Sequence, residues 1–283
     1  MKAALLAGAL LLSVAQPAPT RPRITGIGHV AFRVSDAAAA RHFYGNVLGL
    51  TEQPSSGPSR IAYLVGQRQH VLLEPGLPPN EDERLSHTAF ETTDVKGMAA
   101  YLTSRGFDVL RPANRCEETA IRVADPYGNT VEFVETKWPL ATLRAEAPRA
   151  LASRLLHAGA VVHDEAVADL FYREALGFSE IWRGGRTDGV TSWINMRVPE
   201  GTDYLEYMLV TERPDRRQRG VLHHICLVVP DIQSAWEAVA DRTEPSMRSR
   251  LSPPNVGRNN RWQLNLYDPD GTRTELMEPF TIR

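Results

Sequence analysis

The chain has 283 residues, of which 42% are hydrophobic and 23% are charged, and its formal net charge is −2. This balance is typical of ordinary globular proteins, and the length provides material for two domains. No basic excess indicates a nucleic-acid partner, so a small-molecule substrate is the expected partner.

The first residues have the features of a secretory signal. Met1 and Lys2 precede the apolar run AALLAGALLLSVAQ, which is too short to span a bilayer and has small residues suited to cleavage. We therefore predict a signal peptide over residues 1–15, a secreted or periplasmic location and no stable membrane insertion. An uncleaved membrane anchor is the alternative.

A motif of His, six residues and Asp occurs four times along the chain. The copies are HVAFRVSD from His29, HTAFETTD from His87, HAGAVVHD from His157 and HICLVVPD from His224. The side chains of each copy alternate between two faces with a period of two residues, as in a strand. Each copy ends at an Asp that is placed to cap a following helix. The sequence thus predicts four strands that present a histidine at the same point.

The residues two positions after each histidine share its face of the strand. All four are small: Ala31, Ala89, Gly159 and Cys226. We expect the histidines to face a cleft with room for a ligand, while the opposite face of each strand packs under a helix. Cys226 is interpreted as a small buried hydrophobe rather than as a ligand or nucleophile.

Two further motifs divide the units into pairs. The first and third units share Phe-Tyr-x-x-x-Leu-Gly, which ends at Gly49 and Gly177, each suited to a helix C-cap. The second and fourth share Asp-Pro-x-Gly, which is typical of a type I turn and is interpreted as a hairpin without chemistry. The pattern indicates a duplicated two-unit block. We predict domains over residues 24–135 and 152–280, a linker over 136–151, and a long irregular loop over 244–260.

Each unit closes with a predicted strand that bears one glutamate, 45 to 51 residues after its histidine. These glutamates are Glu74, Glu132, Glu206 and Glu275. A carboxylate among apolar residues is costly to bury unless it is paired or bound to a metal. A salt bridge, such as one from Arg273 to Glu275, is the alternative for any one of them. Two imidazoles with one or two carboxylates form a ligand set for Zn, Mn, Fe, Co or Ni.

The motifs GHVAFRVSD, FYGNVLGL, FYREALGF, DPYGNTVEF and DPDGTRTEL resemble those of the vicinal oxygen chelate superfamily. That superfamily includes glyoxalase I, extradiol dioxygenases, methylmalonyl-CoA epimerase and bleomycin-resistance proteins. The resemblance implies an α+β fold of four βαβββ units, paired into two cupped, mostly antiparallel sheets that each hold a metal at the centre. It implies as ligands His29, Glu74, His87 and Glu132 in the N-terminal cup, and His157, Glu206, His224 and Glu275 in the C-terminal cup.

The resemblance leads us to expect a metal-dependent lyase or isomerase whose substrate offers two adjacent oxygens, with Glu275 or Glu206 as the catalytic base. We expect the C-terminal cup to be the working one, because it has Val161 and Val228 where the N-terminal cup has Arg33 and Glu91. The side chains expected to bind substrate are Arg183, Arg186, Tyr204 and Arg273.

Two alternatives remain open. The first is a metal-free protein that binds or sequesters a small molecule, as resistance proteins of this fold do. The second is a ring-cleaving dioxygenase. It is weakened because the later strands of the third unit contain no histidine to serve as the acid-base group, and because Asn265, not a tyrosine, lies ten residues before Glu275. Tyr267 lies eight residues before it.

Overall fold

A computed structural model describes residues 18–54, 60–110, 118–136 and 149–282. The predicted signal peptide and most of the predicted linker lie outside the described residues. Among the described residues, no helix is long and apolar enough to cross a bilayer.

The first half of the chain forms a seven-stranded mixed sheet with the order β2-β3-β4-β1-β5-β7-β6. Its strands are β1 (Ile24–Val34), β2 (Thr51–Gln53), β3 (Ile61–Val65), β4 (Gln69–Pro75), β5 (Leu85–Thr92), β6 (Glu118–Ala124) and β7 (Thr130–Thr136). Its helices are α1 (Ala37–Arg41), η1 (His42–Val47) and α2 (Val95–Ser104).

The second half forms an eight-stranded mixed sheet with the order β13-β14-β15-β12-β8-β11-β10-β9. Its strands are β8 (Arg154–Val162), β9 (Ser179–Gly184), β10 (Trp193–Arg197), β11 (Tyr204–Leu209), β12 (Ile225–Val228), β13 (Asn255–Val256), β14 (Trp262–Tyr267) and β15 (Arg273–Met277). Its helices are α3 (Glu165–Asp169), η2 (Leu170–Ala175), α4 (Arg216–Leu222), α5 (Ile232–Arg242) and η3 (Pro245–Arg250). The region predicted as a long loop therefore contains a short helix, η3, and a short strand, β13.

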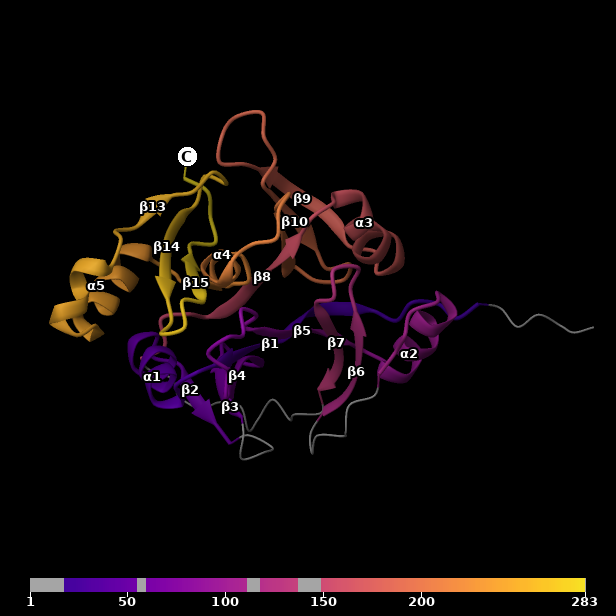
Figure 1. The fold of residues 1–283 in the computed structure, drawn as a ribbon, viewed down its shortest axis with the longest axis horizontal. Helices are drawn as coiled ribbons and strands as arrows, with labels where there is room; N and C mark the ends of the chain where they lie inside the picture. Colours follow the sequence, from indigo (N-terminus) through magenta and orange to yellow (C-terminus); the bar gives the residue numbers. More distant parts are fainter. Residues whose placement is uncertain (1–17, 55–59, 111–117, 137–148, 283) are drawn as a thin grey trace, which may run out of the picture.

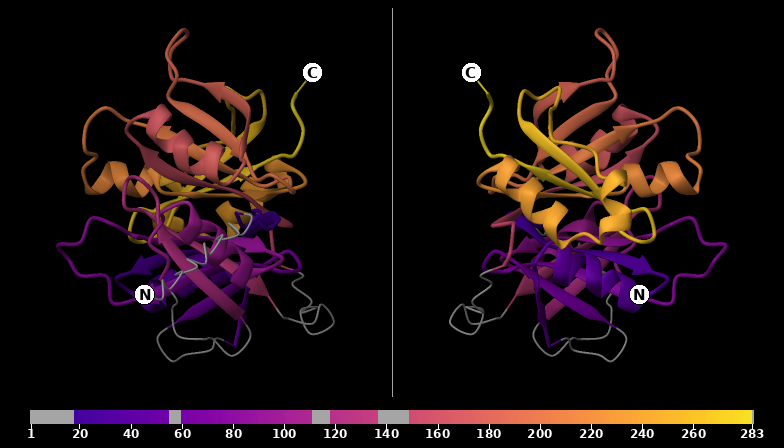
Figure 2. Two further views of the ribbon diagram at one scale, coloured as in Figure 1. Left: turned by 90° about the vertical axis from the view of Figure 1, so that its right-hand side faces the viewer. Right: turned by 90° about the vertical axis from the view of Figure 1, so that its left-hand side faces the viewer.

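Both sheets are built in the same way around a central antiparallel pair, β1 with β5 and β8 with β12. Each central strand pairs on its other side with a parallel strand: β4, β7, β11 or β15. The two sheets lie one above the other in Figure 1, and Figure 2 shows the same arrangement from both sides. The α+β fold of two curled sheets expected from the resemblance is confirmed.

The four motif aspartates begin helices, as predicted. Asp36, Asp94, Asp164 and Asp231 each have extended backbone and accept backbone N–H groups of the helix that follows. Gly49 and Gly177 end their helical segments with φ values of 71° and 78°, which favour glycine. Each histidine strand therefore feeds directly into a capped helix.

The two pair-specific motifs contact each other across the halves of the chain. The hydroxyl of Tyr44, in the first unit, donates to Asp268 in the fourth at 3.2 Å. The hydroxyl of Tyr172, in the third unit, donates to Asp125 in the second at 2.9 Å. The Asp-Pro-x-Gly turns therefore do more than close hairpins, because each anchors a helix of the other half. All four side chains are buried.

Candidate functional site

The strand register brings each histidine beside a small residue of the neighbouring strand. In the second sheet Cys226 lies opposite His157, and the backbone of Gly159 bonds to that of His224. A Cβ on Gly159 would lie 2.1 Å from His224 Nδ1. Glycine is therefore required there because the imidazole of the partner strand occupies the space.

Four side chains with metal-binding groups meet on the concave face of the second sheet, the C-terminal cup. His157 Nε2 lies 3.0 Å from His224 Nε2. Glu206 Oε2 lies 3.2 Å from His224 Nε2, and Glu275 Oε2 lies 3.5 Å from His157 Nε2. The two remaining imidazole-to-carboxylate distances are 3.8 and 3.9 Å. The structure therefore brings together all four residues predicted for this cup.

These distances suit a single ion. Two donor atoms that each bind an ion at about 2.1 Å lie about 3.0 to 3.5 Å apart when their angle at the ion is between about 90° and 109°. The distances between the imidazole nitrogens, and from them to the carboxylate oxygens, run from 3.0 to 3.9 Å, within or just above this range. The site is buried: the side chains of Glu206 and Glu275 are 12% and 6% exposed.

The protonation states also suit metal binding. His224 Nδ1 lies 2.8 Å from the Leu222 carbonyl oxygen. Because a carbonyl only accepts, Nδ1 carries the proton, and the lone pair of Nε2 faces the cluster. Burial, together with the charge of Arg273, lowers the pKa of His224 to about 4. The ring is therefore neutral at pH 7.

The two carboxylates of the C-terminal cup are ionised. Burial alone would raise the pKa of Glu206, but the contact with His224, the neighbouring His157 and the charge of Arg273 hold it at about 2. Burial also opposes ionisation of Glu275, but the hydrogen bond with His157 and the charge of Arg273 lower its pKa. The cup therefore presents two anionic oxygen donors beside the imidazoles.

Arg273 is the cation that faces this cluster. Its Nη2 donates to His224 Nε2 at 2.8 Å and lies 4.0 Å from Glu206 Oε2. One guanidinium beside two carboxylates leaves a net negative charge in a buried site. In addition, His157 Nδ1 has no hydrogen-bond partner within the described part of the chain. A divalent cation would compensate this charge. The residues of the C-terminal cup thus fit a divalent metal.

Tyr204 stacks on His157, with ring centroids 4.6 Å apart and planes 28° from parallel. Its side chain is 4% exposed. Tyr204, which was predicted to bind substrate, therefore lies at the site, where its ring packs against His157 and fixes the orientation of the imidazole.

Two asparagines complete the inner face of the cup. Asn195 lies opposite Glu206, and Asn265 lies opposite Glu275. The Oδ1 atom of each is buried without a hydrogen-bond partner among the described residues. An asparagine donates and accepts hydrogen bonds but transfers no proton at ordinary pH. Sequence reasoning missed Asn195, because nothing in the strand TSWINMRV marks its face or its neighbour.

The N-terminal cup, on the concave face of the first sheet, contains three of its four predicted ligands. His29 Nε2 lies 3.0 Å from His87 Nε2 and 3.4 Å from Glu132 Oε1. Arg122 Nε donates to the other oxygen of Glu132 at 2.6 Å. All three predicted ligands are at most 2% exposed.

The structure does not bring Glu74 into this cluster. Because His29 lies opposite His70, the register places Glu74 opposite Arg33, and Leu72 occupies the position equivalent to Glu206. Glu74 instead forms an ion pair with Arg60. The regular spacing from histidine to glutamate therefore misidentified this residue by two positions.

Arg33 and Glu91, the two charged residues noted in this cup, each contact another residue of the described ranges. Glu91 forms an ion pair with Arg68 at 2.8 Å, while Arg33 donates to the carbonyl of Glu83.

The predicted substrate-binding arginines of the third unit have different surroundings. Arg183 is held on the surface by ion pairs with Glu165 and Glu180. Arg186 lines a cavity of about 950 Å³, together with Trp193 and Leu222. Trp193 lies two residues from Asn195 on the same strand face, and the Leu222 carbonyl bonds to His224. This cavity therefore lies next to the cluster of His157, His224, Glu206 and Glu275.

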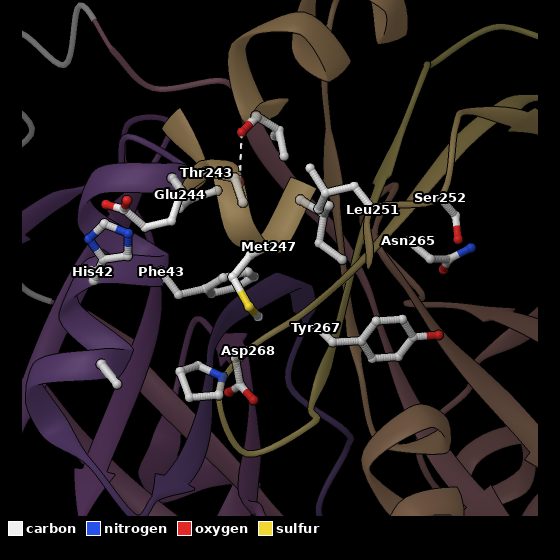
Figure 3. Close-up of a pocket in the computed structure, with 15 residues that line it drawn as sticks. His42, Phe43, Thr243, Glu244, Met247, Leu251, Ser252, Asn265, Tyr267 and Asp268 are labelled. Carbon is white, nitrogen blue, oxygen red and sulfur yellow. Dashed lines mark hydrogen bonds between the residues drawn. The ribbon is translucent and has the colours of Figure 1, made fainter. Parts of the chain in front are cut away.

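A second cavity, of about 670 Å³, lies between the two halves of the chain. Figure 3 shows Phe43 of η1 on one side, Met247 of η3 above and Tyr267 of β14 below. Tyr267, the tyrosine nearest to the position expected in a dioxygenase, lines this cavity and is 51% exposed. Its register partner is Arg273, not Glu275, so it does not supply the missing acid-base group.

The chain was compared with models of known protein families. The model of the Glyoxalase/Bleomycin resistance protein/Dioxygenase superfamily matches residues 26–133 and again 154–276. The two matched segments correspond to the two sheets. A search of curated proteins found no match.

Among solved structures, the chain is similar to ring-cleaving dioxygenases. A variant of homoprotocatechuate 2,3-dioxygenase from Brevibacterium fuscum has a TM-score of 0.73 and 22% identity, with 95% of this chain and 75% of that chain covered. The 2,3-dioxygenase LapB from Pseudomonas sp. KL28 has a TM-score of 0.71 and 17% identity, with 92% and 93% covered. At these identities the likeness concerns the fold.

Proposed function

Since this chain belongs to the Glyoxalase/Bleomycin resistance protein/Dioxygenase superfamily, we propose that it is a divalent-metal-dependent enzyme that binds a small substrate through two adjacent oxygens in the C-terminal cup. The observation that carries this proposal is the proximity of His157, His224, Glu206 and Glu275, whose imidazole nitrogens lie 3.2 to 3.9 Å from the carboxylate oxygens and which leave a net negative charge beside Arg273. The metal-free sequestering alternative leaves that charge without compensation.

The metal would supply Lewis-acid polarisation of the substrate oxygens. The protein's own contribution is to hold the donors and move a proton. Glu206 is the stronger candidate for the base, because it is more exposed than Glu275, lies 3.2 Å from His224 and is the register partner of Asn195. If a metal bound at His224 Nε2, the guanidinium of Arg273 would be available to bind a substrate oxyanion.

Ring-opening oxygenation of a vicinal diol is the first reaction to test. The similar solved structures are dioxygenases. His157 and His224, with Glu206 at 3.2 Å from His224 or Glu275 at 3.5 Å from His157, give the two histidines and one carboxylate found in non-haem iron oxygenases. These similarities support oxygenation over the lyase or isomerase reaction that we expected from the sequence. Because Asn195 and Asn265 transfer no proton, the diol proton would have to pass to Glu206.

A lyase or isomerase remains the second candidate, and Glu206 as a fourth donor favours it. With Glu206 as a ligand, four protein donors would hold the metal and the substrate oxygens would take the remaining positions. With Glu206 free, three protein donors would hold it, and a second reactant besides the substrate would have room to bind. Whether Glu206 binds the metal therefore separates the two reaction classes.

The test uses the full chain, purified and analysed for metal, then reconstituted with Fe(II) or Mn(II). Oxygen consumption is measured with 3,4-dihydroxyphenylacetate and other vicinal diols, and conversion of 2-oxo compounds is measured without oxygen. An oxygenase should consume oxygen, and its Glu206→Gln variant should keep its metal while losing activity. A lyase or isomerase should need no oxygen and should lose metal in the same variant. Absence of stoichiometric metal in both proteins would contradict the proposal.

A further inference from the structure

We propose that Glu83, which belongs to the N-terminal half of the chain, is a positioning residue for the metal ligand His224 of the C-terminal cup. It acts through His223 and helix α4, and it thereby makes metal binding in this cup depend on the N-terminal half. The inference rests on the proposed function, because it concerns how the same site is held in place.

Helix α4 ends directly beside the imidazole of His224. The carbonyl oxygen of Leu222, the last residue of α4, accepts the Nδ1 proton of His224 at 2.8 Å. This contact keeps the lone pair of Nε2 directed at the other donors of the cup. The ring therefore stays in a metal-binding orientation only while the last turn of α4 stays in place.

His223 connects α4 to His224 and points the other way. Its backbone is extended, so its side chain lies on the opposite side of the chain from that of His224. The imidazole of His223 is buried, and its Nδ1 donates to Oε1 of Glu83 at 2.6 Å. The residue directly before the metal ligand is thus bound to a carboxylate of the N-terminal half.

Glu83 makes two more contacts that fix the end of α4. Its Oε2 accepts from Nη1 of Arg219, in the last turn of α4, at 2.7 Å. Its Oε1 also accepts the backbone N–H of Leu85, the first residue of β5, at 3.1 Å. The contacts with Arg219 and His223 are charge-assisted, because the acceptor is a carboxylate. One carboxylate therefore joins the end of α4 to a central strand of the first sheet.

The start of α4 is held by the same connection between β4 and β5, residues 76–84. The guanidinium of Arg84 donates to the carbonyl of Arg216, and Arg216 donates to the carbonyl of Glu81. A Cβ on Gly220 would lie 2.5 Å from the Gly271 oxygen and 3.2 Å from Arg84 Cζ, so the helix is closely packed. A helix of seven residues is not stable alone. The position of α4 therefore depends on these contacts.

Glu200 provides a matched control, because it is a carboxylate that joins the two halves at another place. It accepts from Nη2 of Arg21 at 2.6 Å and from the backbone N–H of Ile24 at 2.6 Å. The side chains of Glu83 and Glu200 are 26% and 25% exposed. The partners of Glu200 lie at and before the start of β1, not on α4. A general loss of packing between the halves should therefore appear in both variants, and a loss of positioning only in Glu83→Ala.

The first measurement uses the full chain without metal. The chain is labelled with isotope-enriched histidine, and NMR follows the exchange of the His224 Nδ1 proton with solvent; the signal is assigned by its absence in His224→Gln. Glu83→Ala should accelerate this exchange about tenfold or more, because the carbonyl acceptor is no longer held, whereas Glu200→Ala should not. The nearly isosteric Glu83→Gln should give a smaller acceleration, and it replaces Glu83→Ala if circular dichroism shows that the alanine variant does not fold.

The second measurement is the affinity for Co(II), determined by competition with a chelator. Glu83→Ala should weaken Co(II) binding about tenfold or more, as the loss of a contact that orients a metal ligand does, and Glu200→Ala should leave it unchanged. In the His224→Gln background Glu83→Ala should have no further effect, because the ligand through which it acts is gone. That comparison also separates the cup from any Co(II) bound elsewhere on the chain.

The outcomes separate this inference from the proposed function. Proton exchange in Glu83→Ala that matches Glu200→Ala, or an unchanged Co(II) affinity, would overturn the positioning role and leave the function standing. An equal loss of affinity in the wild-type and His224→Gln backgrounds would overturn it as well. Faster exchange in a protein that binds no Co(II) would support the positioning of the His224 ring and contradict the proposed function.

Discussion

Replacing Asp268 by Asn tests the contact that joins the two halves of the chain. Asp268 is 4% exposed, and its Oδ1 accepts the backbone N–H groups of Asp270 and Thr272. The Tyr44 hydroxyl donates to Oδ2. Asparagine keeps the Oδ1 acceptor, and its amide N–H can donate to the tyrosine oxygen. The substitution therefore removes the charge while it preserves the contacts.

The magnitude follows from the pKa of the buried carboxyl. Burial, aided by the charge of Asp270, raises the pKa of Asp268 to about 6, from an ordinary value near 4. Between these pH values the folded protein keeps a proton that the unfolded chain has released. The stability contributed by this group therefore falls as the pH rises from about 4 to about 6, and stays low above it. Two pH units correspond to about 3 kcal/mol.

Urea unfolding followed by tryptophan fluorescence, at pH 4 and pH 8, measures the effect. Relative to the wild type, Asp268→Asn should gain about 2 to 3 kcal/mol more at pH 8 than at pH 4. Asp125→Asn, in the equivalent contact with Tyr172, should change in the same direction, because burial also raises the pKa of Asp125. Asp241→Asn is the exposed control. An equal effect of Asp268→Asn at both pH values, or a loss of stability at pH 8, would refute this reasoning.

Three further substitutions address the C-terminal cup. Glu275→Gln should weaken metal binding at least tenfold, because it removes an anionic donor. Metal analysis of this variant and of Glu132→Gln, compared in parallel, shows whether the two cups differ. Equal losses of activity in the two variants would mean that both cups are active. Gly159→Ala should displace His224 and cost about 1 to 3 kcal/mol, measured by urea unfolding together with metal content; unchanged metal content would contradict the packing argument. Arg273→Gln should raise metal affinity, because it removes the cation that competes at His224 Nε2, while it weakens substrate binding; lower affinity in titrations would show that Arg273 only orients the ring.

The parts of the fold that follow from local chemistry could be predicted from the sequence. The Asp caps, the glycines that end two helical segments and the small residue two positions after each histidine are local requirements, and the structure has them all. The duplication was visible because pair-specific motifs repeat in alternate units. What the motifs do together was not visible: the contacts of Tyr44 with Asp268 and of Tyr172 with Asp125 depend on how the halves pack.

The candidate site shows where spacing stops being informative. A glutamate faces the cup only if its strand has the correct register, and a shift of two residues keeps the face but moves the side chain about 7 Å along the strand. Glu74 has the expected spacing from His29, but the register of β4 does not place it in the cup, because β4 pairs His70 with His29. Arg183 failed for a different reason, since Glu165 and Glu180 already hold its guanidinium.

The same register explains how one duplicated block yields two different cups. The His and Asp of each repeated motif serve different ends, because the histidine enters the cup while the aspartate caps a helix. The Phe-Tyr and Asp-Pro-x-Gly motifs stabilise the packing of the two halves, because their side chains contact each other across the halves. The positions beside the carboxylates belong to no motif: Ala62 and Asn195, Leu72 and Glu206, Arg122 and Asn265. Substitutions at these positions change donor number and charge without disturbing a cap or a contact between the halves, so each cup can acquire its own chemistry while the frame stays the same.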